Sequence, residues 1–174
     1  GLMESRFGLN FLEHTSQGIE ADVNRGRDIF ERAWGYESAH PSWGPRMSNL
    51  LGMSLYVLHA NALSLAELPH YLQSPALREK LLAAVPDEGE GHFVRLFWTD
   101  FETQRKDEKQ KWVSPVQNKI YQLLQSREML YMLAQKASTI DFTKIMQERR
   151  IVLLHLDKNL VGGMENVKLL GMAY

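Results

Sequence analysis

The chain has 174 residues, of which 44% are apolar and 24% are charged, a composition that is ordinary for a globular protein. Its formal net charge of −1 excludes a global field that recruits nucleic acid or an anionic membrane, so any such binding needs a local patch. The absence of cysteine excludes disulfides, thiolate metal sites and cysteine nucleophiles, and it fits a reducing compartment. The sequence shows neither a signal peptide nor an apolar window free of polar residues. We therefore expect a cytoplasmic protein without membrane contact.

The first 62 residues of the chain predict two helices. Residues 6–12 are apolar but interrupted by glycine and asparagine, which is typical of an extended lead-in. Apolar positions then repeat with helical period over residues 19–34. Gly26 on the same face either makes room for a close neighbour or is a local weakness that costs about 1 kcal/mol. Residues 42–62 predict a central helix, with Gly44 as N-cap and Pro45 at the first helical position. Its inward face comprises Met47, Leu50, Leu51, Ser54, Leu55, Leu58 and Ala62, and Trp43 can fold back onto it.

Further helices follow from start signals and periodicity. Ser64 and Glu67 form a capping box for a short helix, and Ser74-Pro75 starts another. An aromatic stripe predicts a helix that reaches about residue 104, and a solvated helical run follows over residues 105–111. At Ser114-Pro115 the helix either restarts or kinks, and residues 127–135 predict one more short helix.

The pattern changes after residue 136. Asp141 can cap a two-turn helix, and residues 151–156 form a nearly continuous apolar run with two β-branched residues at its start. Such a run is typical of a strand buried on both faces of a parallel sheet. A loop over residues 157–163 and a helix over 164–174 would follow. One strand cannot pair alone, so we expect it to pair with the N-terminal stretch or with a second copy of the chain.

No complete catalytic motif is present. The acidic group Asp87, Glu88, Glu90 and His92 lacks a known metal-ligand spacing, which favours a solvated loop at a helix start. His155 and Asp157 would lie at the carboxyl end of the predicted strand, where capping is the simpler role. The remaining histidines, at positions 14, 40, 59 and 70, are isolated in sequence and predict structural or exposed positions.

Two groups of cations are candidates for nucleic-acid contact. The first is Arg105, Lys106, Lys109 and Lys111 beside Trp112, and the second is Arg25, Arg27, Arg32 and Arg46. Cations with nearby aromatic rings can contact phosphates and stack on exposed bases. Acidic residues are interspersed in both groups, so a salt-bridged solvated face is the alternative interpretation.

Three stretches occur together in a recognisable order: SWGPRMSNLL at 42–51, SPVQNKI at 114–120, and STIDFTKIMQERRIVLLHLDKNLVGG at 138–163, the last continued by NVKLLG at 166–171. In this order and spacing they resemble the helical insert of TraG/TraD-type conjugative coupling proteins, which are hexameric DNA-translocating P-loop ATPases of type IV secretion. The resemblance covers nearly the whole chain from about residue 6. It implies a mainly α, multi-helix domain with a C-terminal strand–helix remnant of an α/β P-loop ATPase core.

The resemblance also implies an organisation and a function. Residues 1–17 would be the lead-in from the ATPase core, 18–148 the all-helical domain, and 149–174 a strand and helix of the core. The helical domain would engage DNA or a DNA-bound protein cargo at the motor entrance, with the rest of its ATPase domain or a second copy as further partners. Neither Walker motif is present, so we expect no enzymatic activity and no cofactor in this fragment, with ATP and Mg²⁺ bound only by the parent protein. Two alternatives stay open, namely a protein-interaction or adaptor module that does not bind DNA, and a small enzyme that uses His155 and Asp157.

Overall fold

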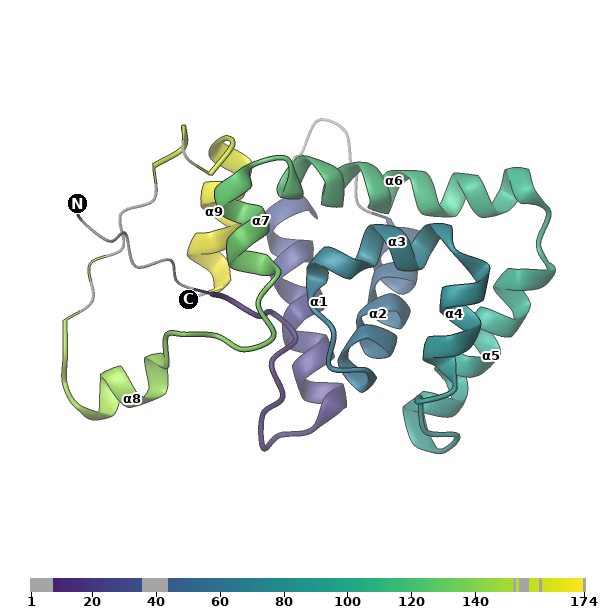
Figure 1. The fold of residues 1–174 in the computed structure, drawn as a ribbon, viewed down its shortest axis with the longest axis horizontal. Coiled ribbons are helices and arrows are strands. Elements are labelled where there is room, and N and C mark those ends of the chain that lie inside the picture. Colours follow the sequence, from purple (N-terminus) through teal and green to yellow (C-terminus); the bar gives the residue numbers. More distant parts are fainter. Residues whose placement is uncertain (1–7, 36–43, 152, 154–156, 160, 174) are drawn as a thin grey trace.

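The computed structural model describes residues 8–35, 44–151, 153, 157–159 and 161–173 (Figure 1). It is mainly helical, as predicted, and the described residues contain no strand. The helices are α1 (Ile19–Gly35), α2 (Pro45–Ala60), the 3₁₀ turn η1 (Leu65–Glu67), α3 (Leu68–Gln73), α4 (Pro75–Leu82), α5 (Gly89–Thr103), α6 (Lys106–Leu124), α7 (Arg127–Leu133), α8 (Phe142–Gln147) and α9 (Met164–Ala173). None of the described helices combines the length and the apolar character that crossing a bilayer requires.

Helix α2 is the centre of the fold, as its sequence predicts. Gly44 is its N-cap in an extended conformation, and Pro45 occupies the first helical position. The predicted apolar face is buried from Met47 to Leu58, and α2 packs against α1, α3, α4, α5 and α6. Ala62 was wrongly placed on this face, because the helix ends at Ala60 and Ala62 is exposed with a positive φ of 50°. Trp43 lies outside the described residues.

Gly26 of α1 faces the N-terminal segment and α2. A Cβ at this position would lie 3.4 Å from Leu12 Cδ2, 3.4 Å from the Phe11 carbonyl oxygen and 3.6 Å from Leu55 Cδ1. These are ordinary van der Waals distances, so an alanine Cβ would fit here and the packing does not require glycine.

Helices α3 and α4 begin where the local signals place them, with one difference, whereas α5 begins at Gly89 and α6 at Lys106, where the sequence predicts no start. The Ser64–Glu67 capping box is present, although it caps the 3₁₀ turn η1 that leads into α3. The Ser74 side chain accepts from the Leu77 N–H at the start of α4. Helix α6 continues on both sides of Pro115, which lies inside it.

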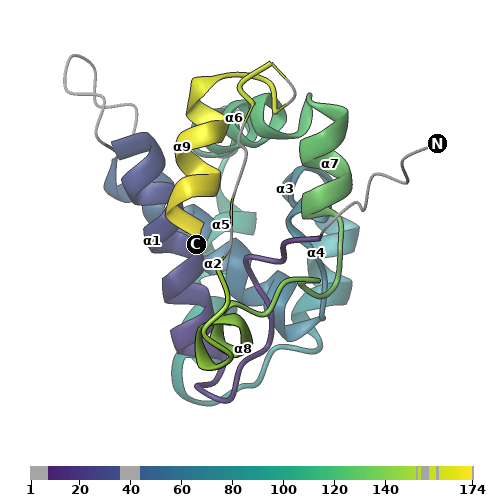
Figure 2. The ribbon, with the colours of Figure 1, turned by 90° about the vertical axis from the view of Figure 1, so that its left-hand side faces the viewer.

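The N-terminal segment pairs with the chain that follows α7, and Figure 2 shows the two running beside each other. The Leu9 N–H donates to the Met132 carbonyl at 3.0 Å, and the Thr139 N–H donates to the Gly8 carbonyl at 3.0 Å. The Asn10 side chain adds a hydrogen bond to the Lys136 carbonyl at 2.7 Å. The backbone groups of the lead-in are therefore engaged by residues 132–139.

The predicted strand at 151–156 is not formed in the described part of the chain. Ile151 and Leu153 are 90% and 91% exposed, while residues 152 and 154–156 lie outside the described residues. The expected pairing of this run with the N-terminal stretch is wrong for Ile151 and Leu153, because residues 132–139 occupy that stretch instead. The helix expected after the run is present as α9, and Leu169 and Leu170 on it are fully buried where it packs against α1.

Candidate nucleic-acid interface

The start of α6 carries the first predicted group of cations. Arg105 is the N-cap, and the three lysines follow within the first two turns. Most of these cations have a carboxylate partner: Arg105 Nε lies 3.3 Å from Asp107 Oδ1, Lys109 Nζ 2.6 Å from Glu102 Oε2, and Lys111 Nζ 2.5 Å from Glu108 Oε1. Lys106 has no ion-pair partner among the described residues. The pairs of Arg105 and Lys111 are exposed and contribute little stability, so these two cations can exchange a carboxylate for a phosphate.

Arg46 of the second predicted group lies against this first group. Its guanidinium carbon stands 5.5 Å from the ring centroid of Trp112, a cation–π geometry. Trp112 is half-buried and packs against Phe97 and Phe101. Lys111 donates a hydrogen bond that lowers the pKa of the Glu108 carboxyl, and the charges of Lys111, Arg46 and Arg105 lower it further. We call Arg46, Arg105, Lys106, Lys109, Lys111 and Trp112 the α6 cluster.

Arg25 and Arg27 do not join the α6 cluster, because they lie on α1. Arg25 Nη2 pairs with Asp22 Oδ1 at 3.2 Å. Arg27 donates to Asn24 Oδ1 at 2.9 Å, and its stem covers Gly52 of α2, where a Cβ would lie 3.4 Å from Arg27 Cδ. Each of the two is held by its own neighbours, and the sequence does not show this separation from Arg46.

Behind the α6 cluster lies a buried ion-pair network that the sequence does not reveal. Arg78 of α4 donates from Nε to Glu102 Oε1 at 2.7 Å, and from Nη1 to the carbonyls of Leu72 at 2.7 Å and Tyr71 at 3.0 Å. Burial alone would raise the pKa of the Glu102 carboxyl, but the hydrogen bonds from Lys109 and Arg78 outweigh it and lower the pKa. The network therefore joins α3, α4, α5 and α6.

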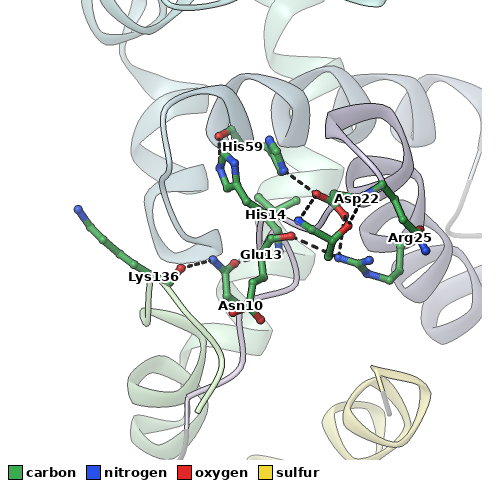
Figure 3. A network of polar contacts seen from close by, with 10 residues as sticks. Asn10, Glu13, His14, Asp22, Arg25, His59 and Lys136 are labelled. Atoms are coloured by element: carbon green, nitrogen blue, oxygen red, sulfur yellow. Dashed lines mark hydrogen bonds and ion pairs between the residues drawn. The ribbon is translucent and has the colours of Figure 1, made fainter. Parts of the chain in front are cut away.

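A second polar network fixes the N-terminal segment on α1 and α2 (Figure 3). The fully buried Asp22 carboxylate accepts from the Thr15 hydroxyl at 2.5 Å, from the Thr15 N–H at 2.8 Å and from His59 Nε2 at 3.0 Å. His14 stacks on His59 with ring centroids 3.9 Å apart, and its Nε2 lies 3.0 Å from the His59 carbonyl oxygen. His14 and His59, which are isolated in sequence, therefore meet in a structural network, and His70 is exposed, both as predicted, while His40 lies outside the described residues.

The chemistry of this network is structural. Because the Asp22 carboxylate accepts at Nε2, that nitrogen carries the proton, and Nδ1 is buried without a hydrogen-bond partner in the described structure. Burial lowers the pKa of the His59 imidazole, so the ring stays neutral. Burial also acts to raise the pKa of Asp22, but hydrogen bonds from Thr15 and His59 lower it. The Thr15 hydroxyl donates to Asp22 and not to His59, so it is not activated as a nucleophile.

The other predicted candidates show local roles. His92 Nδ1 and Asp87 Oδ1 form an exposed pair at 2.9 Å, and no group of three potential metal ligands occurs among the described residues. Asp157 Oδ1 accepts from the Asn159 N–H at 2.8 Å, a turn-capping bond, and its proposed partner His155 lies outside the described residues.

No family model, curated protein or solved structure matches the chain.

Proposed function

We propose that this chain is a helical substrate-engaging domain of a DNA-translocating motor of the conjugative coupling type, and that it contacts DNA or a DNA-bound protein cargo through the α6 cluster. The observation that carries the proposal is the position of Arg46 over Trp112, which joins cations from two helices far apart in sequence into one exposed group. DNA binding of this kind is independent of base sequence, because it rests on phosphate contacts.

The chemistry of the α6 cluster suits a phosphate backbone. The side chains of Arg105 and Lys111 are 86% and 64% exposed, so both can reach a ligand without a change in the fold. The N-terminus of α6 adds a positive dipole end at the same place. The half-buried Trp112 ring offers an aromatic surface next to these cations.

The proposal that the chain belongs to a DNA-translocating motor rests on its resemblance to coupling proteins. One observation supports a further domain or chain that packs against Ile151 and Leu153. Ile151 and Leu153 are apolar and almost fully exposed, and covering such a side chain contributes about 1.5–3 kcal/mol. The rest of an ATPase domain, or a second copy of the chain, would supply that cover. In this proposal ATP and Mg²⁺ bind to the parent protein, and the chain alone hydrolyses no ATP.

A second candidate function is a protein-interaction module without DNA binding, and one observation favours it. Phe93 and Leu96 lie one turn apart on α5 and are 64% and 53% exposed. Exposed apolar pairs of this kind occur at protein interfaces. The salt dependence of DNA binding separates the two functions.

The test is fluorescence anisotropy with labelled DNA between about 50 and 200 mM salt, where counterion release is measurable. We expect the logarithm of the affinity to fall linearly with the logarithm of the salt concentration. The double reversal Lys106→Glu and Lys111→Glu should weaken binding about tenfold or more and reduce the slope by about 2. The matched control reverses two exposed lysines on α8 and α9, Lys144→Glu and Lys168→Glu, and should bind like the parent chain. Affinity that does not change with salt, or an equal loss in the control, would refute DNA contact through the α6 cluster.

A further inference from the structure

A cavity of about 620 Å³ opens beside the α6 cluster, between α3–α4 on one side and the α5–α6 junction on the other. This volume lies in the range of sites that take small molecules or single nucleotides. Its described lining contains cations, amides and apolar side chains, and no carboxylate: Leu72, Gln73, Pro75, Arg78, Phe101, Gln104, Lys106, Lys109, Gln110, Val113 and Gln117. Of the three cations in this lining, Arg78 and Lys109 pair with Glu102, and Lys106 adds a positive charge without a carboxylate partner among the described residues.

The positive wall is held in place by the buried network behind it. The Arg78 side chain is only 4% exposed, and Glu102 and two backbone carbonyls of α3 accept its hydrogen bonds. Glu102 also pairs with Lys109 at 2.6 Å, yet it is not part of the described lining. The carboxylate therefore positions the two cations from behind. Lys106, without an ion-pair partner among the described residues, is the cation available to an incoming anion.

The amide side chains supply donors and acceptors in one small space. Gln73 donates to the Tyr121 hydroxyl at 3.1 Å, and Gln110 donates to the Ser114 hydroxyl at 2.8 Å. Each of these amides keeps its carbonyl oxygen and a second N–H for a ligand. Gln104, at the C-cap of α5, adds a third amide. Amides next to an apolar wall of Pro75 and Val113 fit a planar heterocycle that carries both donors and acceptors.

From this lining we infer that the cavity receives one nucleotide of single-stranded DNA. The base would lie between the apolar wall and the amides, its phosphate would contact Lys106, and the neighbouring phosphates would follow the α6 cluster. The inference rests on the proposed function and specifies its substrate. A base in a duplex is paired and stacked, so it cannot enter without unstacking, whereas a base of a single strand is free to enter. The domain should therefore prefer single strands.

The experiment compares a labelled thymidine oligonucleotide with a blunt duplex of the same length, again by anisotropy. We expect the single strand to bind about tenfold more tightly than the duplex. The double variant Gln104→Leu and Gln110→Leu removes amides without changing charge. It should weaken single-strand binding about tenfold, because each lost hydrogen bond has a modest net value, and leave duplex binding unchanged. The control Gln122→Leu makes the same replacement at an exposed site of α6 outside the cavity lining and should have no effect.

The possible outcomes separate the inference from the proposed function. Salt-dependent binding that is equal for both DNA forms and unaffected by the double glutamine variant would overturn the cavity and leave the α6 cluster standing. Absence of salt-dependent binding to either form would remove the proposed function and the inference together. Free thymidine monophosphate supplies the third arm, and we expect it to bind at least about a hundredfold more weakly than the strand, because it lacks the neighbouring phosphates. Equal affinity would identify a free-nucleotide site and overturn the strand assignment.

Discussion

Replacing Arg78 by methionine tests how much of the fold depends on the buried ion-pair network. Methionine keeps most of the apolar stem and removes the guanidinium. The change deletes two contacts to Glu102 Oε1, both at 2.7 Å, and hydrogen bonds to the carbonyls of Leu72 and Tyr71 at 2.7 and 3.0 Å. Because these groups belong to α3 and α5, the change loosens both helices from α4.

The size of the effect follows from what is left without a partner. Breaking a buried ion pair by removing one partner costs about 3–5 kcal/mol. The lower end applies here, because the Glu102 side chain is 35% exposed and keeps Lys109. The two carbonyls add a cost of about 1 kcal/mol each where water does not reach them. We expect a loss of about 5 kcal/mol in the free energy of unfolding, or roughly 10–20 °C in Tm for a chain of this size.

Urea unfolding followed by circular dichroism measures this loss. The conservative variant Arg78→Lys keeps the charge without the planar fork, so it should lose about half as much. The double variant Arg78→Met with Glu102→Gln should be at least about 1 kcal/mol more stable than the sum of the single changes, because the pair is coupled. A loss below about 1 kcal/mol for Arg78→Met would refute the reasoning, since it would show that the guanidinium is not essential to this packing.

Two further predictions concern the second polar network and the apolar run near the C-terminus. The folded-state pKa values of His59 and Asp22 lie below their ordinary values, so the unfolded chain binds more protons at low pH. The urea midpoint should therefore fall as the pH drops below about 6.5, and more steeply below about 4. The variant His59→Gln should flatten the first phase, exposed His70→Gln should not, and a midpoint that stays constant from pH 7.5 to 5 would contradict the assignment. Ile151→Asp and Leu153→Asp should each change stability by less than about 0.5 kcal/mol, because both side chains are exposed. A loss above about 2 kcal/mol, the size expected for Leu169→Ala in the core, would show that they are buried in the folded chain.

The starts of the helices were predictable because the interactions that fix them are local. Gly44 with Pro45 begins α2, Ser64 with Glu67 closes its capping box, and Asp141 accepts from the Lys144 N–H at the start of α8. Each of these capping interactions joins residues within one helical turn, so the local sequence is enough to predict where the helix begins. The predicted strand is the opposite case, since a strand forms only where another strand supplies its hydrogen bonds, and the described residues Ile151 and Leu153 are not in a strand.

The candidate site was predictable in part. The cations and Trp112 could be named from the sequence, because their residue types and spacing are visible in it. Their grouping was not visible, since Arg46 meets Trp112 only through the packing of α2 against α6. The ion pair of Arg78 could not be predicted from the sequence, because its partner Glu102 is 24 positions away on another helix.

The amino-acid sequence by itself determined the helical class, the places where most helices begin and the faces that they bury, because these depend on caps and on a repeat of 3.6 residues. Only the tertiary structure decided which polar side chains meet. The pair formed by His59 and Asp22 joins residues 37 positions apart, and the cavity with its wall free of acids exists only where helices α3 to α6 come together. A buried charge is stable only beside its partner, and the choice of that partner is made by the packing of the apolar faces.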